Sequence, residues 1–139
     1  MTYQDIEALT IKKEGNSLEF KESTGQLDRS METLCAFLNG EGGTILYGVK
    51  DDGKIIGQTV SDSTKRSIAE AVNRIEPFVD LEITYVAIPG TEKYVIVIFV
   101  EEQRFMRPFT YKGRAYQRIE STTTVMLGSQ LLRSHRLDP

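Results

Sequence analysis

The sequence predicts an α+β domain in which two main helices pack against a mixed β-sheet. Helix-like and strand-like segments alternate in the first half of the chain, and four β-rich segments follow the second helical one. The predicted order is one strand, a helix, two strands, a helix and four strands. With 139 residues, of which 40% are hydrophobic, the chain has the size of a single domain, which we assign to residues 1–139.

The first strand and the first helix are predicted from two different periodicities. Residues 18–22 alternate apolar and charged side chains, the pattern of a half-buried strand. After them, apolar residues recur at helical spacing and form one stripe: Leu27, Met31, Leu34, Cys35 and Leu38. Three glycines among residues 39–43 end the helix, because glycine allows the left-handed dihedrals of a tight reversal.

The next segments predict a central strand and a hairpin. Residues 44–49 are rich in β-forming side chains, so we expect a strand that is buried on both faces. Asp51, Asp52 and Gly53 then form a turn signal that leads into residues 54–57.

A second helix and two further strands follow. Ser61 or Asp62 is the expected N-cap, apolar residues continue at helical spacing to Ile75, and Pro77 closes the helix. Residues 79–88 and 94–100 are predicted strands, and the second of these is apolar at every position and therefore central.

The last predicted element is a hairpin over residues 108–118 that turns at Lys112 and Gly113. Its aromatic side chains alternate with cations, which predicts rings facing the core and cations facing solvent. Residues 127–133 are expected to start a short helix or to fray.

Composition excludes several classes of protein. The net charge of −3 rules out a uniform polycation, and no run of about 18 apolar residues exists, so we expect a cytoplasmic protein without a membrane partner. Cys35 and His135 are the only cysteine and histidine, which excludes an internal disulfide and a Cys/His zinc site. Any metal must be held by carboxylates, and we expect no functional role for His135 in its polar tail.

Charge is distributed unevenly along the chain. Residues 1–102 contain 10 Lys/Arg and 18 Asp/Glu, whereas residues 103–139 contain 7 Lys/Arg and 2 Asp/Glu. Cations interleaved with aromatic rings are typical of a surface that binds DNA or RNA. The candidate nucleic-acid contacts are Arg104, Arg107, Lys112, Arg114 and Arg118. The alternative is a solvated strand edge whose charge prevents aggregation.

Three motifs in order resemble one known family. They are Glu14 followed by residues 19–22, the helix end at residues 35–43, and residues 47–53 with Ile56 and Gly57. Together with residues 107–109 and 116–121, they resemble the Schlafen AlbA-like domain family, formerly described as divergent AAA ATPase-associated domains. The resemblance covers about residues 13–125, which it implies is the core of a Schlafen AlbA-like fold.

The resemblance implies a nucleic-acid-binding domain of the kind found in bacterial and archaeal transcriptional-regulator-like proteins. In animal Schlafens, two such lobes form a core that cleaves transfer and ribosomal RNA with three acidic residues. This chain has one lobe, so that architecture would require a homodimer. The glycine-rich loop at residues 39–43 lacks the Gly-Lys-Ser/Thr of a P-loop and follows a helix instead of preceding one, so an ATPase is not expected.

The three acidic positions of the family match Glu14, Glu19 and Asp51. Converging carboxylates could hold Mg²⁺ or Mn²⁺, and Lys21 could neutralise charge at a scissile phosphate, which would make the protein a metal-dependent endoribonuclease. The structural alternative is that Asp51 belongs to an ordinary hairpin turn and Glu19 to an ion pair.

Overall fold

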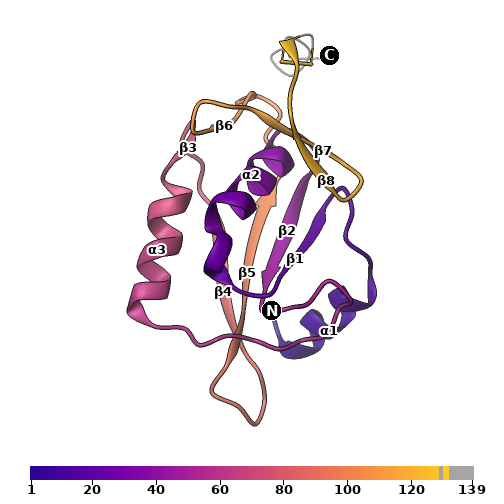
Figure 1. Ribbon diagram of the computed structural model, residues 1–139, viewed down its shortest axis with the longest axis vertical. Helices are drawn as coiled ribbons and strands as arrows, with labels where there is room; N and C mark the ends of the chain where they lie inside the picture. The colour runs from indigo at the N-terminus through magenta and orange to yellow at the C-terminus, as the bar shows by residue number, and fades with distance from the viewer. Residues whose placement is uncertain (129, 132–139) are drawn as a thin grey trace.

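A computed structural model shows a four-stranded sheet and describes residues 1–128 and 130–131 of the chain (Figure 1). Strand β1 (Leu18–Lys21) pairs in parallel with β2 (Gly42–Tyr47), and β2 pairs antiparallel with β5 (Tyr94–Glu101). Strand β4 (Glu82–Ala87) forms the other edge, antiparallel to β5. The predicted α+β class with a mixed sheet is confirmed, and β2 and β5 are both central.

Helices cover the two faces of this sheet. Helix α2 (Leu27–Leu38), preceded by the short η1 (Thr24–Gln26), connects the parallel strands β1 and β2. It packs with α3 (Asp62–Val72) on one face, over the larger of two apolar clusters. The smaller cluster lies on the opposite face, where Ile6 of α1 (Tyr3–Ile11) is completely buried. Alternate side chains of β2 and β5 enter each cluster, as expected for strands buried on both faces.

Sequence periodicity did not predict α1. The helix buries only Ile6, so it has almost no apolar stripe to detect. It begins instead with a capping box, in which the Thr2 hydroxyl accepts a hydrogen bond from the Asp5 N–H at 3.3 Å and the Asp5 carboxylate accepts one from the Thr2 N–H at 2.8 Å.

The second helix and the strand after it are shorter than predicted. Ser61 is the N-cap, as expected, and its hydroxyl accepts a hydrogen bond from the Thr64 N–H at 3.2 Å. However, α3 ends at Val72, and Ile75 belongs to the two-residue strand β3 (Ile75–Glu76). The strand predicted over residues 79–88 spans only β4.

The expected hairpin over residues 108–118 is wrong in its strand pairing. Lys112 and Gly113 form a tight turn with positive φ angles of 50° and 79°, as predicted. Next to the turn, the two arms pair through the antiparallel Tyr111–Arg114 bridge. Beyond this bridge they separate: β6 (Thr110–Tyr111) pairs with β3, and β7 (Tyr116–Ile119) pairs with a strand that was not predicted, β8 (Thr122–Val125). Figure 1 shows the β7–β8 hairpin crossing over the end of α2.

Two glycines of the resemblance motifs have a clear physical role. Gly48 and Gly57 have φ angles of 99° and 67°, and the Gly48 carbonyl accepts hydrogen bonds from the N–H groups of Ile56 and Gly57. A Cβ on Gly48 would lie 2.8 Å from the Gly57 Cα, so the two backbones can approach only without side chains. This contact closes the loop that carries Asp51.

No helix within residues 1–128 and 130–131 is both long and apolar enough to cross a membrane.

Candidate nucleic-acid interface and acidic cluster

The structure brings the three predicted acidic residues together beside β1. Glu19 lies on β1, Glu14 lies in the loop before it, and Asp51 follows β2, the parallel neighbour of β1. Glu19 and Asp51 line one pocket of about 580 Å³, and Glu14 and Asp51 line a second pocket of about 430 Å³. Parallel pairing brings the C-terminal ends of β1 and β2 to the same edge of the sheet, which places Asp51 near the end of β1. Glu14 reaches the same region because its carboxylate accepts a hydrogen bond from the Phe20 N–H of β1.

Glu14 is the member of this cluster with the most strongly altered acidity. Its pKa is raised from 4.5 to about 7, first by burial and then by a hydrogen bond with Glu19. The Phe20 N–H, which donates to Oε1 of Glu14 at 2.6 Å, lowers this pKa, whereas the charges of Glu19 and Asp51 raise it further. Below about pH 7 Glu14 is therefore mostly protonated, which reduces the negative charge of the cluster.

Glu19 is held by Arg118 in a buried ion pair. Nη1 of Arg118 lies 3.1 Å from Oε2 of Glu19, with the side chains only 3% and 10% exposed. The Thr33 hydroxyl also donates to this carboxylate, at 3.4 Å. The structural alternative for Glu19, an ion pair, is therefore present, although its partner is distant in sequence and not the neighbouring Lys21.

The remaining donors of Arg118 are also occupied. Nε donates to the Gly15 carbonyl at 2.8 Å, Nη2 to the Leu18 carbonyl at 3.4 Å, and Nη1 to the Thr123 hydroxyl at 2.9 Å. The guanidinium also lies 5.5 Å from the centre of the Phe37 ring. Arg118 therefore joins the β7–β8 hairpin to β1 and α2.

The expectation that the cations face solvent is wrong for Arg118. Residues two apart on a strand point to the same face, so Arg118 turns inward together with Tyr116, which is buried. Arg114 lies before β7 begins at Tyr116, so the alternation of this strand does not extend to it, and it is exposed. The predicted burial of the rings is correct for Phe109, Tyr111 and Tyr116, whereas Phe105 is 77% exposed.

These carboxylates do not fit a divalent metal ion as arranged. Among the described residues, no group of three or more His, Cys, Asp and Glu side chains is placed to hold one. Glu19 already binds a guanidinium, and Glu14 accepts a hydrogen bond from the Phe20 N–H and holds a proton below about pH 7, so two of the three carboxylates are engaged. Lys21 lines the pocket with Glu19 and Asp51 and forms no salt bridge within residues 1–128 and 130–131.

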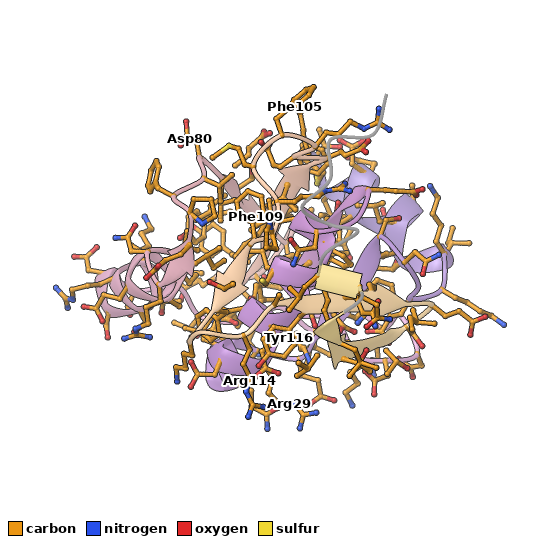
Figure 2. The ribbon with its side chains drawn as sticks, turned by 90° about the horizontal axis from the view of Figure 1, so that it is seen from above. Arg29, Asp80, Phe105, Phe109, Arg114 and Tyr116 are labelled. Carbon is orange, nitrogen blue, oxygen red and sulfur yellow. The ribbon has the colours of Figure 1, made fainter. Side chains whose placement is uncertain are left out.

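The five predicted cations fall into three separate groups. Arg104 and Arg107 both approach Oε1 of Glu102, at 3.6 and 3.5 Å. Arg104 is 62% exposed, whereas Arg107 is 19% exposed and also donates to the Gly40 carbonyl. Figure 2 shows Phe105, next to Arg104, and Arg114 at opposite edges of the molecule. Arg118 forms the third group, in the interior, so the sequence neighbours do not form one continuous surface.

The turn at Lys112 and Gly113 carries the second group. Lys112 Nζ lies 3.0 Å from Oδ2 of Asp28, on the first turn of α2. Arg114 is exposed and forms no salt bridge in the part of the chain that the structure describes. Sequence reasoning missed Arg29, which Figure 2 places at the same edge as Arg114. No local signal marked it, because it lies in the acidic part of the sequence.

Asn39 anchors the basic segment to the end of α2. Its side-chain amide donates to the carbonyls of Phe109 and Tyr116, both at 3.0 Å, and its Oδ1 accepts from the Phe109 N–H at 2.7 Å. The glycine-rich loop after α2 is therefore a structural helix end, as the sequence favoured. His135 lies outside the described residues, as do residues 129, 132 and 133 of the predicted segment 127–133.

Comparison with known families assigns the fold. The family description Schlafen, AlbA_2 matches residues 14–127, most of the chain. The chain belongs to the Schlafen AlbA_2 family. The resemblance predicted from the sequence motifs is thus confirmed. In this AlbA_2 domain the motifs correspond to the acidic residues beside β1, the end of α2 and the Gly48–Gly57 contact.

Two solved structures share this AlbA_2 fold. The N-terminal domain of an ATP-dependent DNA helicase RecG-related protein from Nitrosomonas europaea has a TM-score of 0.58 at 22% identity, over 88% of this chain and 91% of that one. The DIP2311 protein from Corynebacterium diphtheriae has a TM-score of 0.56 at 21% identity over 80% of this chain. The match spans only 22% of the Corynebacterium protein. A search of the curated proteins found no match.

Proposed function

We propose that this AlbA_2 domain binds the phosphate backbone of DNA or RNA through the turn at residues 112–114. The observation that carries the proposal is the position of Arg114, which is exposed, forms no salt bridge with any described residue and projects from a tight turn between buried aromatic rings. A cation held in this way is free to contact a phosphate. Family membership and the fold shared with the helicase-related domain support a nucleic-acid-related role.

The other predicted cations have lesser parts in this proposal. Arg104 is exposed but lies near Glu102 at the opposite edge, so it would contact a different part of a long ligand. Arg107 is mostly buried against Gly40 and Glu102, and Arg118 is buried against Glu19. We propose that both support the fold and do not touch the ligand.

Binding at several salt concentrations tests the proposal. Labelled single-stranded RNA, single-stranded DNA and duplex DNA are titrated with wild type, Arg114→Ala and Arg104→Ala, with fluorescence anisotropy as the readout. Each lost phosphate contact lowers the slope of log K against log salt by about 0.7 to 0.9. We expect this change for Arg114→Ala. Lack of affinity for all three ligands at low salt, or an unchanged slope for Arg114→Ala, would overturn the proposal.

Two finer parts of the proposal concern assembly and context. We propose a homodimer, because a single lobe offers a small surface, and a place within a bacterial or archaeal transcriptional regulator. Light scattering tests the dimer: a particle of about twice 15.7 kDa supports it, and a particle of 15.7 kDa argues against it.

The second candidate is a metal-dependent endoribonuclease, favoured by the convergence of Glu14, Glu19 and Asp51. Because the carboxylates as arranged do not fit a metal ion, we derive no catalytic step for it. Cleavage of transfer RNA that requires Mn²⁺ and disappears in both Glu19→Gln and Asp51→Asn, with folding retained, would establish this function.

A further inference from the structure

Four exposed cations from three separate segments lie around Asp28, at the start of α2. Arg29 follows it on α2, Arg74 comes just after α3, and Lys112 and Arg114 lie on the turn after β6. The pKa of the Asp28 carboxyl is lowered, first by hydrogen bonds from Tyr111 and Lys112 and then by the charges of Lys112 and Arg74. Asp28 thus brings together Arg74 and Lys112, which are 38 positions apart in sequence.

A groove separates Arg29 from Arg74. It has a volume of about 540 Å³ and lies between the η1–α2 segment and α3. Arg29 and Arg74 both line it, together with the small or polar residues Thr24, Gly25 and Ser67. Small side chains allow a chain of phosphates and sugars to approach the backbone closely.

The acids of this region do not cancel its cations. Asp28 is engaged by the Tyr111 hydroxyl and by Lys112 Nζ, so its carboxylate is already compensated. Glu70 also lines the groove, on α3. Arg29, like Arg114, has no salt bridge to any residue within 1–128 and 130–131, and both project at the same edge in Figure 2. The planar guanidinium group suits a phosphate, which it can bind through two parallel hydrogen bonds.

We propose that Arg29 and Arg74 join Lys112 and Arg114 in one phosphate-binding surface, the Asp28 surface. It takes the sugar–phosphate backbone of a polynucleotide along the groove between α2 and α3. This inference rests on the proposed function and names residues outside the basic C-terminal segment. Arg29 lies on α2 and Arg74 in the short turn between α3 and β3, so the Asp28 surface takes its arginines from both sides of the groove.

Alanine variants of Arg29 and Arg74 test the Asp28 surface. Arg29→Ala, Arg74→Ala and the double variant are compared by anisotropy with Arg66→Ala, which removes an exposed arginine of α3 that does not line the groove. The ligands are labelled single-stranded RNA, single-stranded DNA and duplex DNA of equal length. Arg74→Lys keeps the charge and serves as a conservative replacement. Circular dichroism confirms that each variant is folded.

We expect each single variant to bind about five- to tenfold more weakly at low salt and to lower the salt slope by about 1. Arg66→Ala should bind like wild type, and Arg74→Lys should keep the wild-type slope. If Arg29→Ala and Arg74→Ala behave like Arg66→Ala while Arg114→Ala weakens binding, the Asp28 surface is refuted and the proposed function survives. If wild type binds none of the three ligands, the proposed function fails as well.

Discussion

The guanidinium of Arg118 lies 3.1 Å from the carboxylate of Glu19, across 99 positions of sequence, with both side chains almost excluded from water. The residue that the sequence suggested as a nucleic-acid contact and the residue that it suggested as a metal ligand therefore neutralise each other. In this domain the acidic cluster already contains a cation, and that cation is part of the protein.

Removing Arg118 should destabilise the domain strongly. Arg118→Met leaves Glu19 buried without its partner, and a loss of this kind costs about 3 to 5 kcal/mol. Urea unfolding of wild type and variant measures the difference. In the double variant Arg118→Met/Glu19→Met no charge is left unpaired, so at least half of the loss should be recovered. A single variant within about 1 kcal/mol of wild type would mean that the pair is not formed.

Glu14 should make stability depend on pH. Its folded-state pKa of about 7 lies above its ordinary value of 4.5, so the folded protein holds the proton more tightly than the unfolded chain does. The stability from this proton is complete below about pH 4.5 and is lost as the pH rises to about 7. Glu14→Gln imitates the protonated form and should remove this loss.

The pH experiment compares unfolding free energies of wild type and Glu14→Gln from pH 4 to 9. The variant should gain stability relative to wild type between about pH 4.5 and 7, with no further change above about pH 8. Carbon-13 NMR of the Glu14 carboxyl gives its pKa directly. A difference that stays constant across this range, with a carboxyl that titrates near 4.5, contradicts the raised pKa of Glu14.

Asn39 should be important for stability, although it lies at the end of α2 where the glycine-rich loop begins. Asn39→Ala removes three hydrogen bonds and leaves the Phe109 N–H and two carbonyls without their partner, which should cost about 2 to 4 kcal/mol. Asn39→Asp should be at least as destabilising, because a carboxylate cannot donate to the two carbonyls. The exposed Asn73 supplies the control: Asn73→Ala should stay within about 0.5 kcal/mol of wild type in urea unfolding.

Mn²⁺ should not turn the wild-type protein into a ribonuclease. With Glu19 bound to Arg118 and Glu14 mostly protonated below about pH 7, Asp51 is the only one of the three carboxylates not engaged in this way. Labelled transfer RNA is incubated with protein and either Mn²⁺ or EDTA, and the products are separated on a denaturing gel. Metal-dependent products that vanish with Asp51→Asn would favour the second candidate function over this prediction.

Much of the sheet and its main helix could be predicted from local sequence. The apolar stripe of α2 and the unbroken apolar runs of β2 and β5 reflect burial that every nearby residue shares, so their periodicity is visible in one short window. The Ser61 cap and the turn at Lys112 were predictable for the same reason, because each depends on the residues of one turn.

The remaining features needed contacts between distant segments. The pairing of β6 with β3 and of β7 with β8 was not visible, because alternation shows which side chains share a face but not which strand lies beside them. Helix α1 gave no signal with one buried side chain. The same holds for the candidate site. Its basic and acidic residues could be recognised from the sequence, but the side chains that contact them and their burial could not.

The sequence by itself determined the fold class, the family motifs and the residue types available for a site, because these depend on composition and local periodicity. The tertiary structure decided which of those residues reach solvent. It buried Arg118 against Glu19, left Arg114 exposed, and brought Arg29 and Arg74 to the groove beside it. The physical reason is that exposure and charge pairing depend on which distant strands and helices pack together. Here the β7–β8 hairpin packs across the end of α2, and this packing determines which of its side chains are buried.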